Sequence, residues 1–243
     1  MAWLSQIHVT IFARAPVAGR CKTRLAQTLG APRAAEFAAR SLDALIERLQ
    51  PAGIRWSLSP ASVTDALWFE RHGYGLCLGE TQATGDLGRR MVRAHREACA
   101  EGAAISAVIG SDCPDAPLET VLGRLREALP MAEDQPLSWL CPTADGGYWC
   151  WAVGRAVLPR LHDELASVAW SSGRELAQSC AQLEDWGVIV EQLGAGYDVD
   201  TYEDLVALIA RLEKATSQAA SRREVPPWQR RLLLALHDMW GTA

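Results

Sequence analysis

Short apolar runs alternate along the chain with longer segments in which apolar residues recur every three or four positions. The short runs are typical of buried strands, and the longer segments are typical of amphipathic helices. The predicted strands are residues 7–13, 54–59, 74–79, 104–112, 136–143, 146–154 and 188–193. The predicted helices are residues 31–49, 63–72, 85–102, 117–129, 172–187, 201–215 and 227–240. This alternation predicts an α/β fold, a three-layer α/β/α sandwich with a mostly parallel central sheet.

The length of 243 residues suits one large α/β domain, which we place at residues 1–215. Residues 216–226 are small and polar, contain two arginines and end in proline, so they predict a linker. Residues 227–243 then predict a C-terminal helix whose apolar residues recur at helical spacing. We expect this helix to dock on the body or on a partner subunit, and a homodimer stays open.

Composition excludes several classes of protein. Apolar residues make up 49% of the chain and charged residues 22%, with a net charge of −5, so we expect no general nucleic-acid binding. No apolar stretch approaches the length of a membrane span, and the first residues lack the pattern of a signal peptide. The seven cysteines form no CxxC pair. We therefore expect a cytoplasmic protein without disulfides and without a membrane partner.

The stretch "ARAPVAGRCKTRLA" follows the first predicted strand and concentrates positive charge in an acidic chain. Gly19 lets the backbone approach a ligand closely, and four cations could neutralise a di- or triphosphate. The stretch lacks the first glycine of a Walker A motif and the glycine before its lysine, so that interpretation fails. Solvated surface cations remain the simpler alternative. The four cations are Arg14, Arg20, Lys22 and Arg24.

Carboxylates follow the predicted strand 104–112 in the stretch "GSDCPD". Ligands of parallel α/β sheets bind outside the carboxyl ends of the strands. Mg²⁺ and Mn²⁺ favour one or two carboxylates together with phosphate oxygens, so Asp112 is a candidate metal ligand. For Asp115 we favour a turn or a helix cap before residues 117–129.

Two further polar stretches allow two interpretations each. In "PTADGGYW", Asp145 and the following glycines predict a tight hairpin, although they would also permit close approach of a substrate. In "YDVDTYEDL", Asp200 or Thr201 is positioned to cap the last helix of the fold. Asp200 could instead supply a second metal carboxylate beside Asp112.

Five stretches together carry a family resemblance: "FARAPVAGRCKTRLA", "GDLGRRM", "GSDCPDAPL", "PTADGGYW" and "DVDTYEDL". Their order resembles the bacterial DUF2064 family, whose members are often labelled rSAM/selenodomain-associated transferase 1 or glycosyltransferase. This family is similar to the nucleotide-diphospho-sugar transferase (GT-A) superfamily, near molybdenum cofactor guanylyltransferase and phospholactate guanylyltransferase. The resemblance runs from about residue 7 to residue 212.

The resemblance implies a role for individual residues. Asp112 would be the metal aspartate after the fourth strand, and Asp200 the second metal ligand, with Asp198 as the alternative. Lys22 would contact phosphate, and Asp145 would be an acceptor ligand or a base. The chain departs from the family at Tyr202, which replaces a proline, at "WSS" in residues 170–172, and at Arg14, where lysine is common. The positions implied for the nucleotide and the acceptor are Arg14, Gly19, Arg20, Lys22, Arg24, Gly146, Gly147 and Tyr148.

The expected activity is therefore transfer from a nucleotide donor that depends on Mg²⁺ or Mn²⁺, with Asp112, Lys22 and Asp145 at the reacting centre. By analogy with the family we favour a glycosyltransferase that uses an NDP-sugar as its small-molecule nucleotide donor and an acceptor that the sequence does not identify. A nucleotidyltransferase that releases pyrophosphate, and a nucleotide-binding protein without turnover, are the alternatives.

Overall fold

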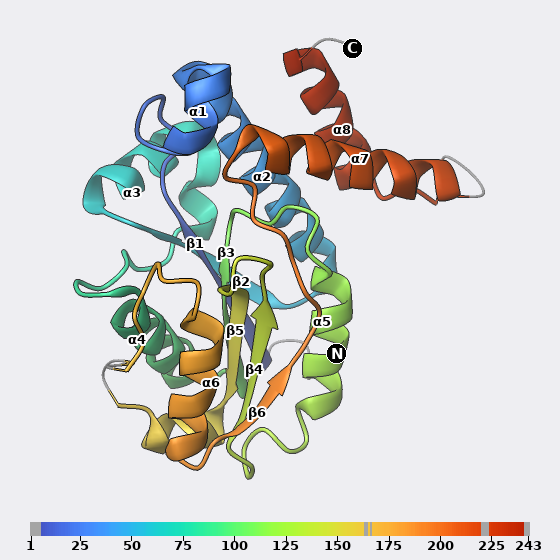
Figure 1. The fold of residues 1–243 in the computed structure, drawn as a ribbon. Helices are drawn as coiled ribbons and strands as arrows, with labels where there is room; N and C mark the ends of the chain where they lie inside the picture. The colour runs from blue at the N-terminus through green and yellow to red at the C-terminus, as the bar shows by residue number, and fades with distance from the viewer. Residues whose placement is uncertain (1–5, 163–164, 166, 220–223, 241–243) are drawn as a thin grey trace.

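The computed structural model describes residues 6–162, 165, 167–219 and 224–240. One six-stranded sheet in the order β2-β1-β3-β5-β4-β6 forms its centre (Figure 1). Every neighbouring pair is parallel except those of β5, which runs antiparallel to β3 and β4. This arrangement confirms the mostly parallel sheet. The strands are β1 (Ile7–Ala13), β2 (Arg55–Pro60), β3 (Ile105–Gly110), β4 (Leu137–Pro142), β5 (Tyr148–Gly154) and β6 (Ile189–Gln192).

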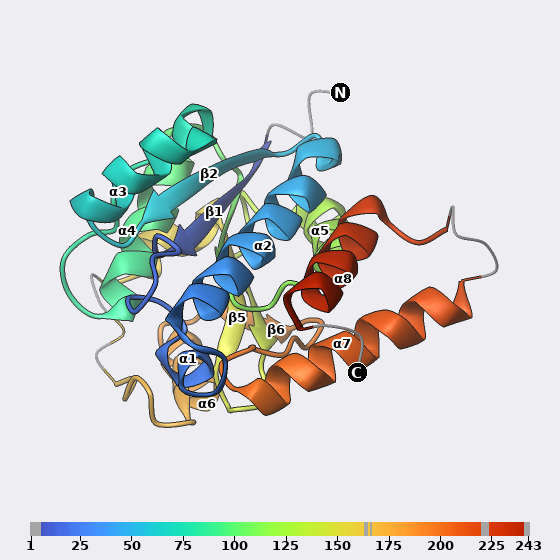
Figure 2. The same cartoon turned by 90° about the horizontal axis from the view of Figure 1, so that it is seen from above.

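Helices cover both faces of the sheet, as the sandwich prediction requires (Figures 1 and 2). The α-helices are α1 (Thr23–Leu29), α2 (Ala31–Leu49), α3 (Val63–Phe69), α4 (Leu87–Ala100), α5 (Leu118–Ala128), α6 (Glu175–Asp185), α7 (Tyr202–Gln218) and α8 (Pro227–Trp240). Apolar residues of α2 and α5 share one buried cluster with the sheet. Apolar residues of α4 and α6 share a second cluster on the opposite face.

The central strands β1 and β3 are buried because both of their faces are covered. Along β1, Ile7, Val9 and Ile11 belong to the cluster with α2 and α5, and Phe12 packs on the cluster with α4 and α6. Each fully buried apolar side chain contributes roughly 1.5–3 kcal/mol to folding. The two strands are therefore a rigid base for the loops that follow them.

The strand predicted at residues 74–79 is wrong. The chain there forms a π-helical turn (Glu70–Tyr74) and a 3₁₀ turn (Gly75–Cys77), and only Leu78 makes an isolated bridge to β2. Gly73 has a φ of +89°, which turns the chain, and the side chain of Leu76 is fully exposed. The apolar pattern belongs to a surface turn, so Asp112 follows the third strand of the sheet and not the fourth.

Three local predictions have mixed outcomes. Residues 143–147 form the expected hairpin between β4 and β5, and Asp86 is the N-cap of α4. Thr201 caps α7 through a capping box with Asp204. Asp115 lies in a turn before α5, as expected, but it caps no helix, because the N-cap of α5 is Pro117 and makes no side-chain cap bond. The short helix α1 was missed because it buries only Leu25 and so lacks a periodic pattern.

The C-terminal helix α8 packs beside α2 and α7 (Figure 2). Leu232 and Leu236 of α8 are buried in one cluster with Leu208 and Leu212 of α7. Residues 220–223 and 241–243 of the predicted linker and terminal segment lie outside the described residues. The division into domain, linker and docking helix stays a prediction. Within the described ranges, no helix is long and apolar enough to cross a membrane, and all seven cysteines are free.

One fully buried histidine links α4 to β3. His95 is hydrogen-bonded through Nδ1 to Ser106 Oγ at 2.9 Å, and its ring packs edge-on against Trp151. Burial lowers the pKa of His95 from 6.5 to about 3. Between these values the unfolded chain holds a proton that the folded chain does not, so stability falls as the pH is lowered from 6.5.

The variant His95→Gln should remove this contribution while keeping a polar group near Ser106. The free energy of unfolding of the wild type minus that of the variant should be constant above about pH 7.5. Below pH 6 the difference should fall by about 1.4 kcal/mol per pH unit. Urea unfolding between pH 5 and pH 8 measures it, and a difference that does not change with pH would contradict the buried neutral histidine.

Candidate active site at the strand ends

A cavity of about 470 Å³ opens at the carboxyl ends of β1 and β3. Its walls come from the loop after β1, the loop after β3, residues 82–90 and the residue before the cap of α7. These are the positions at which a parallel α/β sheet binds ligands. The polar residues that line the cavity are Arg14, Arg20, Lys22, Thr23, Arg24, Gln82, Arg90, Ser111, Asp112 and Asp200.

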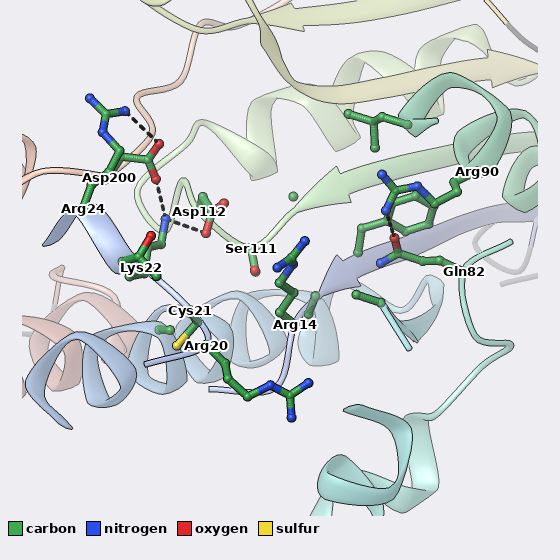
Figure 3. Close-up of a pocket in the computed structure, with 17 residues that line it drawn as sticks. Arg14, Arg20, Cys21, Lys22, Arg24, Gln82, Arg90, Ser111, Asp112 and Asp200 are labelled. Carbon is green, nitrogen blue, oxygen red and sulfur yellow. Dashed lines mark hydrogen bonds and ion pairs between the residues drawn. The ribbon is translucent and has the colours of Figure 1, made fainter. Parts of the chain in front are cut away.

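The ammonium of Lys22 lies between two carboxylates from distant segments (Figure 3). Its Nζ is 2.6 Å from Oδ1 of Asp112 and 3.1 Å from Oδ1 of Asp200. The lysine side chain is 6% exposed, whereas the carboxylates are 51% and 45% exposed and open into the cavity. Arg24 adds a second cation 3.6 Å from Asp200. The expected meeting of Lys22 with Asp112 is therefore present.

The backbone and the charge of Lys22 are both unusual. Burial alone would lower the pKa of Lys22, but the charges of Asp112 and Asp200 raise it above the ordinary value of 10.5, so it is a cation at neutral pH. Lys22 is also left-handed, with φ 46° and ψ 45°, directly before α1. Such a conformation costs on the order of 1–3 kcal/mol in a residue with a Cβ atom. The surrounding contacts hold this backbone in place and aim the ammonium at the carboxylates.

A buried arginine of α2 forms hydrogen bonds to the loop that carries Asp112. Arg48 of α2 donates to the carbonyl oxygens of Pro114 at 2.7 Å and Ala116 at 2.5 Å. Its Nε also donates to Glu119 at 2.9 Å. The side chain of Arg48 is almost fully buried. The motifs of the sequence do not indicate this role of Arg48, although a cation on the apolar face of α2 is a signal for it.

Segments near α7 hold the same loop from the other side. Arg211 forms two bonds to Asp115, at 2.6 and 3.2 Å, which explains the role of this carboxylate. The backbone N–H of Val199 donates to the carbonyl oxygen of Asp112 at 3.1 Å. These contacts fix Asp112 relative to Asp200, since both depend on the chain around residues 198–211.

The opposite end of the cavity carries two arginines, Arg14 and Arg90, that form no ion pair with a carboxylate of the described residues. Nη1 of Arg90 donates to Oε1 of Gln82 at 2.9 Å. Burial lowers the pKa of Arg90, and the charge of Arg14 lowers it further. Arg14 makes no hydrogen bond or ion pair with the part of the chain that the structure describes. Sequence analysis found Arg14 but not Arg90, because that arginine belongs to a helix with many charges.

Some expected site residues lie elsewhere. Gly19 does not line the cavity but turns the loop, with a φ of +80°. Gly146 packs against the backbone of Gly173, whose oxygen would be 2.1 Å from an added Cβ atom. Tyr148 is partly buried against α6, where its hydroxyl lies 3.3 Å from Ser179 Oγ, and this burial raises its pKa. Neither Gly146 nor Tyr148 lines the cavities described here.

A second cavity of about 280 Å³ adjoins the first and shares Arg24 and Asp200 with it. Asp145 lines it and is oriented by hydrogen bonds to Oδ1 from Thr143 Oγ1 at 2.6 Å and from Gly147 N at 3.1 Å. The hairpin and the site interpretations of this stretch are thus compatible. Gly147 contributes its backbone N–H to this arrangement.

Asp198 also lines the second cavity, but it does not share Lys22 with Asp112. The thiol of Cys113 donates to it at 2.8 Å. Burial raises the pKa of Asp198, and the charges of Asp112 and Asp145 raise it further. Between the two alternatives for a partner of Asp112, the geometry therefore favours Asp200.

The carboxylates of Asp112 and Asp200 converge on one cation position, which is the donor chemistry that Mg²⁺ and Mn²⁺ accept. Among the residues that the structure describes, no group of three or more His, Cys, Asp or Glu could hold a metal ion. A divalent ion here would need further oxygen ligands from a phosphate or from water. The two aspartates therefore fit a metal that binds together with a phosphorylated ligand.

The fold defined by this sheet and cavity is that of nucleotide-sugar transferases and nucleotidyltransferases. A protein of Desulfovibrio desulfuricans G20 that is provisionally named a nucleotide-diphospho-sugar transferase superposes with a TM-score of 0.76 at 21% identity, covering 97% of this chain and 98% of that chain. CMP:2-keto-3-deoxy-manno-octonic acid synthetase complexed with CTP has a TM-score of 0.53 at 14% identity, covering 87% and 100%. A nucleotidyl transferase from Methanothermobacter thermautotrophicus has a TM-score of 0.50 at 16% identity, covering 86% and 99%.

The chain belongs to the DUF2064 family, described as an uncharacterized protein conserved in bacteria. The family model matches residues 46–172, more than half of the chain. The matched range contains Asp112 and Asp145, whereas Lys22 and Asp200 lie outside it. No curated protein matches the chain significantly.

The variant Lys22→Met should destabilise the protein, because it leaves Asp112 and Asp200 facing each other without a cation. Methionine has a side chain of similar length to lysine, so the substitution removes the charge while the left-handed backbone at this position is kept. We expect the free energy of unfolding to fall by about 1–2 kcal/mol, less than for a fully buried pair since both carboxylates are half-exposed. Urea denaturation at pH 7 measures this change, and the loss should shrink when Asp200→Asn is added. A variant as stable as the wild type would contradict the account.

Proposed function

We propose that this protein is a metal-dependent transferase that binds a nucleotide donor in the first cavity. The observation that carries the proposal is the convergence of Asp112, Asp200 and Lys22 at one point of that cavity. Two carboxylates and a lysine, with further arginines on the same walls, suit a phosphate chain bound with a divalent ion. The fold shared with nucleotide-using proteins supports the proposal.

Asp112 and Asp200 would hold Mg²⁺ or Mn²⁺, and Lys22 would exchange its carboxylate contacts for a phosphate oxygen. Arg14 and Arg24 would add charge-assisted hydrogen bonds along the phosphate chain. The metal, when bound, would stabilise negative charge on phosphate oxygens. The protein would supply fixed charges and position, which are the main contributions to catalysis at phosphate groups.

The donor we favour is a nucleoside diphosphate sugar. In that reaction the bond between the anomeric carbon and the diphosphate oxygen breaks, and a bond from the acceptor oxygen to that carbon forms. The diphosphate leaves with the electron pair of the broken bond, and the acceptor hydroxyl loses a proton. Asp145 is the proposed acceptor ligand or base, because Oδ2 accepts no hydrogen bond from the described residues while Oδ1 is held in place.

The charges of the second cavity support a hydroxyl acceptor. Its walls carry four carboxylates and two guanidinium groups. Both arginines are already paired, Arg24 with Asp200 and Arg211 with Asp115. A phosphorylated acceptor would bring negative charge beside these acids, which is unfavourable at short range. An uncharged hydroxyl compound would meet no such repulsion.

A nucleotidyltransferase is the second candidate, since proteins of that class share the fold. It would join a nucleoside triphosphate to a phosphorylated acceptor and release pyrophosphate. The two candidates share the first cavity and differ in the second. The product decides between them: release of a nucleoside diphosphate from NDP-sugars supports glycosyl transfer, and release of pyrophosphate from triphosphates supports nucleotidyl transfer. Binding without either product would favour a protein without turnover.

The variant Asp112→Asn should weaken nucleotide binding in the presence of Mn²⁺ by tenfold or more, because it removes one of two carboxylate ligands. Without metal the variant and the wild type should bind nucleotide with similar affinity. Calorimetric titration with a panel of nucleoside diphosphates measures both.

The control is Asp185→Asn, which removes an exposed carboxylate at the end of α6. Its affinity should equal that of the wild type with and without Mn²⁺. Equal affinity of Asp112→Asn and the wild type in Mn²⁺ would remove Asp112 from the proposed metal site.

A further inference from the structure

Gln82, at the end of the first cavity opposite Lys22, is held by hydrogen bonds to the protein through its backbone and through both atoms of its side-chain amide. Its backbone N–H donates to the carbonyl of Pro60 at 2.9 Å, and its Nε2 donates to the carbonyl of Ser59 at 3.0 Å. Its side-chain oxygen accepts from Arg90. A glutamine reads adenine through both atoms of its amide, and here each of these atoms already makes one hydrogen bond to the protein. Gln82 therefore orients Arg90.

The guanidinium of Arg90 offers the cavity hydrogen-bond donors and no acceptor. Its Nε donates to the carbonyl of Asp86 at 3.2 Å and its Nη1 to Gln82, so three of the five N–H groups of the guanidinium make no hydrogen bond to the described residues. The side chain is partly buried, and the nearby charge of Arg14 is of the same sign. Phe12 and Leu87 add apolar wall to the same cavity. A flat apolar group with hydrogen-bond acceptors at its edge suits this end.

The different side chains at the two ends of the first cavity determine how a nucleotide would be oriented in it. Phosphates belong beside Asp112, Asp200 and Lys22, where the metal ligands converge. In the view of Figure 3, Arg14 lies between this cluster and the pair of Arg90 and Gln82. A nucleotide with its phosphates at the first end therefore directs its base toward the second.

We propose that Arg90, held by Gln82, selects a base that offers a carbonyl oxygen beside an acceptor nitrogen, namely guanine or cytosine, and rejects adenine. The inference rests on the proposed function, since it needs a nucleotide in the first cavity. Guanine offers O6 and N7, which match an arginine fork. Cytosine offers O2 and N3. Adenine places an amino group beside each of N7 and N1, so the fork faces a donor there.

The test compares GDP, CDP and ADP by calorimetric titration in Mn²⁺. The wild type should bind GDP or CDP at least about tenfold more tightly than ADP, the discrimination that one two-bond contact to a base provides. Arg90→Ala should abolish this preference. Arg90→Lys, which keeps the charge without the fork, should abolish it as well. Gln82→Ala should reduce it, because Arg90 then loses its orientation.

The matched control is Arg89→Ala, which removes the same charge from the neighbouring, exposed position of α4. It should keep the preference of the wild type. Inorganic pyrophosphate is the second probe, because it has no base, and Arg90→Lys should bind it as the wild type does. Thermal unfolding of each variant shows whether it is folded.

Three results would overturn the proposal. Equal or tighter binding of ADP by the wild type would show that the cavity does not read a carbonyl base. A loss of pyrophosphate affinity in Arg90→Lys as large as its loss of GDP affinity would place Arg90 on phosphate. If Arg90→Ala still prefers GDP or CDP to ADP, another residue selects the base. Failure of the wild type to bind any nucleotide or pyrophosphate would instead remove the proposed function itself.

Discussion

The contact between Lys22 and the two carboxylates of Asp112 and Asp200 is the constraint on which the site depends. It joins the loop after β1, the loop after β3 and the start of α7, which are far apart in the sequence. Two aspartates that face each other repel unless a cation lies between them. The lysine supplies that cation, and the buried Arg48 fixes the loop that presents Asp112. The cluster is thus a preformed position for positive charge.

The charges around this cluster make the first cavity positive and leave the adjoining second cavity acidic. A protein of net charge −5 keeps a focused positive field here because Arg14 and Arg90 form no ion pair with a carboxylate of the described residues, whereas Lys22 and Arg24 do. The adjoining cavity is acidic, and its arginines are paired. An anion is therefore attracted to the first cavity and opposed in the second. This difference would separate the proposed phosphorylated donor from the proposed uncharged acceptor without a conformational change.

Most strands of the sheet and the residues at the centre of the site could be predicted from the sequence, for physical reasons. Buried strands such as β3 are continuous apolar runs, and polar residues at their ends lie at one edge of the sheet, so Lys22 and Asp112 could be expected to meet. The pattern failed at residues 74–79, where apolar residues lie in an exposed turn. It also failed for Arg48 and Arg90, whose roles depend on partners about 70 and 8 residues away that helical periodicity does not reveal. The family resemblance implied that Gly146 and Tyr148 lie at the acceptor side, but tertiary packing directs them toward α6.

The most direct measurement is a crystal structure of the protein with Mn²⁺ and a nucleoside diphosphate, with the metal located by its anomalous scattering. The account predicts one metal peak between the carboxylates of Asp112 and Asp200, with the ammonium of Lys22 turned onto a phosphate oxygen. A nucleotide bound elsewhere, or a metal peak away from both aspartates while Lys22 stays between them, would contradict it.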